Sequence, residues 1–204
     1  MWSDPPYGVL YTGKTKDALT IENDDAAGLP GLLSAAFGTA DEVLAEGAPI
    51  YIAHPPGALS VVFGQCFLGV GWHLHETLVW VKNSMVLGHS DYHYKHEPIL
   101  YGWKGANRRW YAGRDQVSVF EVDRPSRSEE HPTMKPVDLI IAHLQNSTRR
   151  GDLVLEPFAG SGSTIIACES LSRCARAVEI EPRYAAVCLK RWADMTGIAP
   201  RRAD

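Results

Sequence analysis

The sequence predicts an α/β protein built on an open, mostly parallel β-sheet. Strand-like and helix-like segments alternate along the chain, and near its end two glycines stand in a turn between a strand and a helix. Such alternation is typical of parallel sheets whose faces are covered by helices. At 204 residues the chain is long enough to bury one substantial core, so we expect a single domain over residues 1–204.

The first half of the chain contains helices and strands in turn. Apolar residues at helical spacing predict a helix within 29–47, interrupted at Gly38 and stopped by Gly47. The short β-branched and aromatic run 48–54 ends at a Pro-Pro-Gly turn, which favours a strand buried on both faces. One further helix and two strands are predicted at 58–72, 75–82 and 97–103.

A basic loop region separates this half from the rest. Residues 104–131 are rich in Gly, Asn, Arg, Asp and Ser around one strand candidate at 117–122, so we expect a small insertion there. Helix and strand patterns then resume. The predicted order is helix, strand, helix, strand and helix, at 135–148, 152–158, 162–172, 176–181 and 181–197.

Charge is distributed unevenly along the chain. The formal net charge is −4, and residues 1–60 carry two Lys against eight Asp or Glu. Residues 101–150 carry nine Lys or Arg against six acids. Any polyanionic partner is therefore expected to meet the second half.

The cysteines predict neither a disulfide framework nor a metal site. They lie outside any C-x-x-C pair and have no histidine at zinc-ligand spacing. We expect buried thiols in a reducing compartment at Cys66, Cys168, Cys174 and Cys188. Since no leader pattern is present and no apolar run approaches the ~20 residues of a membrane span, we expect a cytoplasmic protein.

A glycine turn predicts a nucleoside-binding site. The segment VLEPFAGSGST places Gly160 and Gly162 between a strand and a helix, where backbone N–H groups can approach a ligand. Glu179 follows near the end of the next strand and can bind ribose hydroxyls, with Glu181 as a competing candidate that could instead start the last helix. Because Ile165 occupies the third glycine position of dinucleotide sites, S-adenosylmethionine fits best.

The tetrapeptide Asp4-Pro5-Pro6-Tyr7 has the groups that an exocyclic amine requires. The two prolines hold the backbone extended and leave carbonyl acceptors free, Asp4 adds a carboxylate, and the ring of Tyr7 can stack on an extruded base. A surface turn is the structural alternative.

The matching segments resemble the amino-group DNA methyltransferases, in the permuted class with D-P-P-Y before the cofactor loop. They are DPPYGV, HETLVWVK, HYKHEPILYG, HPTMKP, EPFAGSGST and AVEIEPRY. The chain is most similar to phage and prophage-type adenine enzymes, relatives of restriction-modification methylases. This resemblance implies a Rossmann-like fold, S-adenosylmethionine as cofactor and DNA as substrate.

The resemblance also assigns residues to roles. It implies that Phe158, Gly160, Ser161 and Gly162 lie against the cofactor, that Glu179 holds its ribose, and that Thr133 and Lys135 lie near its methionine end. For Lys135, a solvated lysine in the first helical turn is the open alternative. Asp in the first position of D-P-P-Y favours adenine N6, with cytosine N4 as the alternative. We expect Asp4 and the carbonyl of Pro5 to accept hydrogen bonds from the amine, without a covalent intermediate.

Two segments mix basic and aromatic side chains, as expected where phosphates and exposed bases are bound. They are NSMVLGHSDYHYKHEP and YGWKGANRRWYAGR, and the phosphate candidates are Lys104, Arg108, Arg109 and Arg114. A solvated loop is the alternative. The histidines of the first segment are not expected to bind metal, because the chemistry needs none. A short insertion at 104–131 predicts low sequence specificity.

The start of the chain raises a separate expectation. Family members have a hydrophobic strand before D-P-P-Y, whereas this chain supplies only Met1, Trp2 and Ser3. We therefore expect a truncated strand, with an upstream segment missing or a partner, such as a second copy, supplying it. The activity of the isolated chain is left open. Other readings are an inactive DNA-binding partner subunit, a protein or RNA methyltransferase, and, most remotely, a nicotinamide dehydrogenase.

Overall fold

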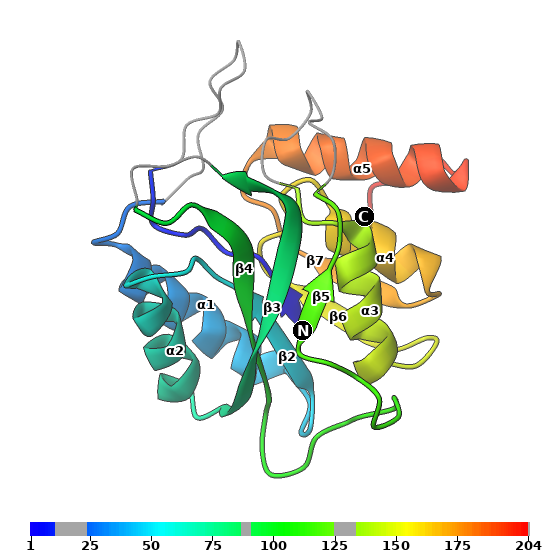
Figure 1. The fold of residues 1–204 in the computed structure, drawn as a ribbon. Helices are drawn as coiled ribbons and strands as arrows, with labels where there is room; N and C mark the ends of the chain where they lie inside the picture. The colour runs from blue at the N-terminus through cyan, green and yellow to red at the C-terminus, as the bar shows by residue number, and fades with distance from the viewer. Residues whose placement is uncertain (11–23, 87–90, 125–133, 204) are drawn as a thin grey trace.

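The computed structural model describes residues 1–10, 24–86, 91–124 and 134–203 (Figure 1). Strands and helices alternate through most of the chain, as the sequence predicts. The elements are β1 (Trp2–Ser3), α1 (Leu29–Val43), β2 (Pro49–Ala53), α2 (Leu59–Gly69), β3 (His73–Val86), β4 (Tyr94–Trp103), β5 (Val119–Glu121), α3 (Val137–Ser147), β6 (Leu153–Glu156), α4 (Ser163–Ser170), β7 (Cys174–Ala177) and α5 (Pro182–Thr196).

The strands form a mostly parallel sheet. Five of them pair in the order β1-β2-β4-β3-β5, and within this group β4 alone runs opposite to the others. β6 and β7 form a parallel pair, and β6 packs against β1. The direction of β4 matters for function, because the chain leaves β4 at the edge of the sheet where β2 begins.

Helices cover both faces of the sheet, and β2 shows why. All five of its residues are buried, and successive side chains point to opposite faces. Tyr51 and Ala53 join a core with α3 and α4, whereas Ile50 and Ile52 join a core with α1 and α2. In Figure 1, α1 and α2 accordingly lie on one side of the strands and α3 and α4 on the other. This is the double coverage that a parallel sheet requires.

Met1 to Ser3 occupy the position where the sequence analysis expects a truncated strand. The backbone N–H of Tyr51 bonds to the carbonyl of Met1 at 3.0 Å, and Trp2 and Ser3 pair in parallel with β2. Trp2 is buried and donates through Nε1 to Nδ1 of His143 on α3, at 3.1 Å. These few residues connect β2 to β6 and place Asp4 directly at the end of β1.

Several element boundaries differ from the predicted ones. Helix α1 continues through Gly38, whose Cβ position is open space, and ends at Val43 before reaching Gly47. β7 ends at Ala177, so Glu179 lies beyond the strand. Gly47 has a left-handed φ of +74°, and a Cβ there would lie 2.5 Å from the carbonyl oxygen of Asn107. This glycine therefore serves the turn before β2 rather than a helix end.

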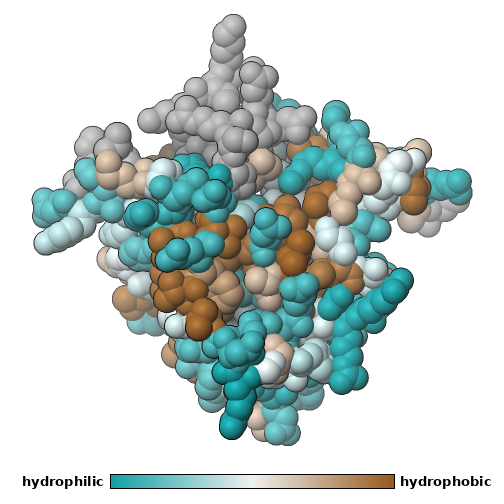
Figure 2. Space-filling model, turned by 45° about the vertical axis from the view of Figure 1, so that its right-hand side comes forward, coloured by the Kyte–Doolittle hydropathy of each residue, from teal (hydrophilic) through white to brown (hydrophobic). Residues whose placement is uncertain are grey.

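The four cysteines are free thiols. Cys66, Cys168 and Cys188 are buried as free thiols, but Cys174 is exposed, so the expectation of four buried thiols is wrong at that position. No helix in the described ranges is long and apolar enough to cross a membrane. Figure 2 shows apolar side chains gathered near the middle of one face, with hydrophilic residues around them.

Candidate functional site

A cavity of about 790 Å³ lies where β1 and β6 end. Its wall includes Asp4 to Tyr7 after β1, and Glu156 to Ser161 after β6. After β1 the chain crosses to β2 on one side, and after β6 it crosses to β7 on the other side. The strand order therefore reverses between β1 and β6. A crevice at such a reversal is the usual ligand site of open α/β sheets.

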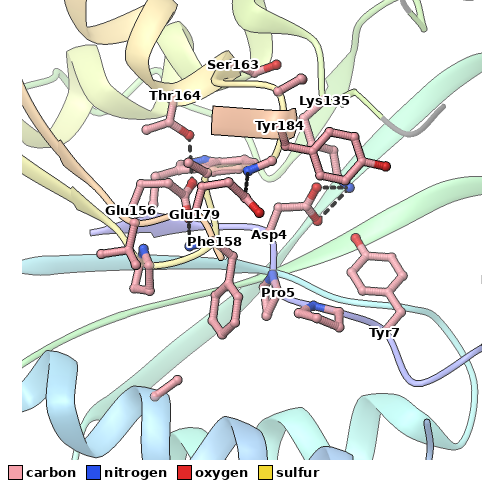
Figure 3. Close-up of a pocket in the computed structure, with 18 of the residues that line it drawn as sticks. Asp4, Pro5, Tyr7, Lys135, Glu156, Phe158, Ser163, Thr164, Glu179 and Tyr184 are labelled. Carbon is pink, nitrogen blue, oxygen red and sulfur yellow. Dashed lines mark hydrogen bonds and ion pairs between the residues drawn. The ribbon is translucent and has the colours of Figure 1, made fainter. Parts of the chain in front are cut away.

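Asp4 and Tyr7 are held from across the cavity (Figure 3). Lys135 Nζ lies 2.7 Å and 2.8 Å from the two carboxylate oxygens of Asp4. The hydroxyl of Tyr7 donates to Oε2 of Glu97 at 3.1 Å, and its ring packs edge-on against Phe63. Pro5, which lies between Asp4 and Tyr7 along the chain, is buried. The tetrapeptide is therefore a fixed part of the cavity wall and not a surface turn.

Lys135 is a buried lysine, not a solvated one. It is 7% exposed and precedes α3, and its Nζ also contacts Oε2 of Glu97 at 3.1 Å. Glu97 in turn pairs with Lys82 at 2.5 Å through Oε1. Burial opposes the charged form of Lys135, but Asp4 and Glu97 outweigh it and raise the lysine pKa. The open alternative of a first-turn solvated lysine is therefore wrong.

The carboxyl groups at this end of the cavity have opposite pKa shifts. Burial raises the pKa of Asp4, with Lys135 opposing the shift and the like charge of Glu97 adding to it. Burial also acts on Glu97, but Lys135 and Lys82 dominate and lower its pKa to about 2. Glu97 is therefore ionised at neutral pH, and Asp4 is the more basic carboxylate of the two.

The glycine turn forms the other end of the cavity. Gly160 and Gly162 have left-handed φ values of +52° and +82°, and α4 begins directly after them. A Cβ on Gly162 would lie 3.0 Å from Sγ of Cys188 on α5, so a side chain there would disturb both the backbone and the helix packing. Ser163 Oγ is buried and has no hydrogen-bond partner among the described residues, which leaves it available to a ligand.

Glu179 lies beside the glycine turn, although it is outside β7. Its Oε2 accepts a hydrogen bond from the N–H of Gly160 at 2.7 Å, and its Oε1 accepts from the N–H of Glu181 at 2.9 Å. Glu181 is the N-cap of α5 and accepts from the N–H of Arg183. Of the two acids considered, Glu181 therefore starts the last helix, and Glu179 faces the turn.

The remaining cofactor candidates divide between the cavity and the undescribed segments. Phe158 and Ser161 line the cavity, and Ser161 is held by Arg191, whose Nη1 donates to its carbonyl. Thr133 lies outside the described residues. Among the described side chains, no group of three or more His, Cys, Asp or Glu could hold a metal ion.

Glu156 is a buried carboxyl group whose role was not predicted from the sequence. Oε1 accepts hydrogen bonds from Ser3 Oγ at 3.1 Å and from the N–H of Phe158 at 3.0 Å, and Oε2 accepts from Thr164 Oγ1 at 2.8 Å. Burial raises its pKa to about 8. At neutral pH the folded protein therefore holds a proton on Glu156 that the unfolded chain releases.

We expect Glu156→Gln to be more stable than the parent chain at alkaline pH. The folded pKa lies above the unfolded value, so the parent chain loses stability as pH rises from about 4.5 to about 8, by on the order of 1.4 kcal/mol for each pH unit. The neutral amide does not ionise. Thermal melts at pH 5 and pH 9 should therefore give similar midpoints at pH 5 and a higher midpoint for the variant at pH 9. An equal difference at both values would contradict the assignment.

The predicted phosphate-binding residues do not lie at the cavity. Lys104, Arg108, Arg109 and Arg114 follow β4, whose end lies where β2 begins, and the cavity is at the opposite edge of the sheet. Hydrogen bonds join the backbones of Gly47 and Lys104, at 2.9 Å, and of Arg109 and Gly47, at 3.0 Å. In Figure 1 the loop that follows β4 lies below the strands, away from the turn between β6 and α4.

Two of these cations are engaged within the protein. Lys104 Nζ contacts the carbonyl of Asp41 at 2.5 Å and its carboxylate at 3.2 Å. The guanidinium of Arg108 lies over the rings of Trp103 and Trp110, at 5.6 Å and 5.7 Å from their centroids. A role of this loop in binding DNA stays a prediction, and the position of the cavity does not support it.

Glu97 and Lys82, like Glu156, are site residues that were not predicted from the sequence. Glu97 and Lys82 lie in segments quoted for the resemblance, HYKHEPILYG and HETLVWVK. Lys82 directly follows the apolar run 78–81, and Glu97 directly precedes the apolar run 98–103. A charged side chain in such a position is rarely buried without a partner. That signal marks both residues as candidates, but it does not reveal that Glu97 pairs with both Lys82 and Lys135.

Comparison with known proteins gives concordant matches. Residues 1–190 match the family model N6_N4_Mtase, described as DNA methylase. The type II methyltransferase M.XycI of Xanthomonas campestris pv. cyanopsidis is 31% identical over 134 residues, which cover 59% of this chain and 45% of the relative. The chain thus spans less than half the length of that relative.

Two solved structures share the fold. The M1.HpyAVI–SAM complex aligns with a TM-score of 0.69 and 22% identity, covering 93% of this chain and 86% of the other. The cytosine-N4-specific PvuII DNA methyltransferase aligns with a TM-score of 0.74 and 15% identity, covering 93% and 77%. The Rossmann-like architecture predicted from the sequence is thereby confirmed.

Proposed function

The chain belongs to the amino-group DNA methylase family, and from this premise we propose that it transfers a methyl group from S-adenosylmethionine to the N6 amine of adenine in DNA. The observation that carries the proposal is the position of Asp4. Its carboxylate lies in the wall of the same cavity as the glycine turn and Glu179. A carboxylate for the amine and a nucleoside site for the methyl donor thus share one space.

The glycine-turn end of the cavity fits the cofactor. Glu179 offers a carboxylate for the ribose hydroxyls, and the unpartnered hydroxyl of buried Ser163 offers a further hydrogen bond. Gly162 lets the turn pack closely on Cys188 of α5, because a Cβ at this position would lie 3.0 Å from its Sγ. Exposed Ile180, beside Glu179 in the cavity wall, supplies an apolar surface for the adenine ring.

The opposite end suits the target amine. S-adenosylmethionine supplies an already activated methyl group, so the protein mainly has to align the amine lone pair with it. Asp4 and the carbonyl of Pro5 accept hydrogen bonds from the two amine hydrogens, which favours a tetrahedral nitrogen. Tyr7 presents its ring to a base that has left the duplex. No cysteine nucleophile is required.

The choice of adenine rests on Asp4 as the first residue of D-P-P-Y. Cytosine N4 is the alternative target, because the cytosine-N4-specific PvuII enzyme has the same fold. Adenine and cytosine both present an exocyclic amine beside a ring nitrogen, so the groups described at this end of the cavity suit either base.

DNA is expected to approach the sheet edge that holds the cavity. β4 begins at this edge, and residues just before and within its start are exposed, among them Tyr92 and Lys95. Arg124 lines the cavity and is exposed. Aromatic and basic side chains of this kind bind phosphates and unstacked bases. We therefore place the DNA contacts at this edge rather than on the loop after β4, and still propose low sequence specificity.

The test is to incubate the purified chain with S-adenosylmethionine and unmethylated DNA and to quantify modified nucleosides by mass spectrometry. We expect N6-methyladenine, spread over sites that share fewer than four fixed bases. N4-methylcytosine would overturn the choice of base and retain the site. If the chain binds the cofactor and yet yields no modified nucleoside, the assignment of DNA as its substrate is wrong.

A further inference from the structure

Four buried or half-buried charges alternate in sign beside the D-P-P-Y segment. Lys82 Nζ pairs with Glu97 at 2.5 Å, Glu97 with Lys135 at 3.1 Å, and Lys135 with Asp4 at 2.7 Å. We call these four residues the carboxylate–lysine network. They come from β3, β4, the segment before α3, and the segment after β1. The set carries no net charge, because its two carboxylates balance its two ammonium groups.

Glu97 is the centre of this network. Besides the two lysines, it accepts the hydroxyl of Tyr7 at 3.1 Å, so it contacts one member of D-P-P-Y directly and reaches Asp4 through Lys135. The strand register places Glu97 opposite Trp80, two residues from Lys82 on the neighbouring strand. Rigid sheet pairing therefore fixes the distance between Glu97 and Lys82.

Resting on the function proposed above, we propose that Glu97 and Lys82 are positioning residues for methyl transfer, which set the orientation and the acceptor strength of Asp4 through Lys135. Neither residue is assigned a contact with the base or the cofactor. Their effect passes through the ammonium group of Lys135, which both oxygens of Asp4 contact.

The physical reason lies in how much positive charge Asp4 experiences. Lys135 fixes the rotamer of Asp4, but an uncompensated ammonium group would also make the carboxylate a weaker acceptor for the amine. The negative charge of Glu97 offsets the positive charge of Lys135. Lys82, which also pairs with Glu97, reduces the size of that compensation. Replacing an isolated buried ion pair with apolar residues is often neutral for stability. A chain of charges that ends on a reactive carboxylate therefore calls for a functional explanation.

Other titratable groups lie near the network. Tyr7 contacts Glu97, His54 at the end of β2 is influenced by Glu97, and Glu156 on β6 is influenced by Asp4. Burial lowers the pKa of His54 and raises that of Glu156 to about 8. Both groups are thus mainly neutral at pH 7, which leaves the network as the main source of charge around Asp4.

The experiment measures the ionisation of Asp4 without requiring turnover. ¹³C NMR of carboxyl-labelled aspartate follows each titration, and an Asp4→Asn sample assigns the Asp4 signal. We expect Glu97→Gln to lower the pKa of Asp4, because it removes a like charge. Lys82→Met should raise the pKa of Asp4, because it removes a positive charge from the network. Glu42→Gln, which removes an exposed charge on α1, should leave the signal unchanged.

Kinetics provide the second readout. Activity requires ionised Asp4, so the acid limb of the pH profile for kcat should move to lower pH in Glu97→Gln and to higher pH in Lys82→Met. At the plateau, kcat should fall about tenfold in Glu97→Gln, with KM for DNA within about twofold, as expected for loss of coupling to an acceptor. Loosened packing alone would not move the two variants in opposite directions.

A double variant keeps the proposal testable if one single variant folds poorly. Glu97→Gln combined with Lys82→Met removes one charge of each sign, so the pKa of Asp4 should lie between those of the single variants. Unchanged or same-direction shifts in folded variants would overturn the proposal. An inactive parent chain with the expected NMR shifts would instead contradict the proposed function and leave the network intact.

Discussion

Asp4→Ala is expected to lower the rate of methyl transfer by at least about 100-fold while leaving cofactor affinity within a few fold. Removing a positioned group that acts on the reacting atoms typically costs 10²–10³-fold. Asp4 and the glycine turn lie on different segments of the cavity wall, so the nucleoside site should be unaffected. Lys135 keeps Glu97 as its partner at 3.1 Å, which limits the damage to the fold. Single-turnover rates and calorimetric titration with S-adenosylmethionine measure the two effects.

Asp115→Ala provides the matched control. Asp115 is exposed in the loop after β4, at the edge of the sheet away from the cavity. Its removal should leave both the rate and the affinity unchanged. If Asp4→Ala retained more than a tenth of the parent rate, Asp4 would not be the group that accepts the amine hydrogens, and the adenine proposal would lose its main support.

Glu179→Ala is expected to weaken binding of S-adenosylmethionine by about 10- to 100-fold. A carboxylate that accepts hydrogen bonds from a ligand typically contributes about 1.5–3 kcal/mol. In the described structure its two oxygens accept from the N–H groups of Gly160 and Glu181, at 2.7 Å and 2.9 Å. The substitution therefore also frees the glycine turn from the loop after β7. Equilibrium dialysis with labelled cofactor gives the dissociation constant.

Glu181→Ala separates this effect from a general loss of charge. Glu181 is the N-cap of α5, so its removal should cost about 1 kcal/mol of stability and leave the dissociation constant nearly unchanged. Thermal melts and the same dialysis assay test both parts. If Glu181→Ala weakened binding more than Glu179→Ala did, the two acids would have to exchange roles.

Some features of the site follow from short stretches of sequence. The left-handed glycines between β6 and α4, Pro182 in the first turn of α5, and the proline pair after Asp4 each depend on local backbone chemistry. Periodicity also identified α1, β2 and α3 to within a few residues. It misjudged Gly38, because a glycine weakens a helix but does not end one when α1 packs well on both sides of it.

The α/β class, the glycine turn and the D-P-P-Y segment could be predicted from the sequence, since propensity and turn chemistry act between neighbouring residues. The direction of β4 could not: in the folded chain β4 runs against the other strands of its sheet, which moves Lys104 and Arg108 away from the cavity. The pairing of Lys135 with Asp4, 131 positions apart in the sequence, could not be predicted either. Contacts of this kind depend on strand order and direction, and these are set by the packing of two cores rather than by any local pattern.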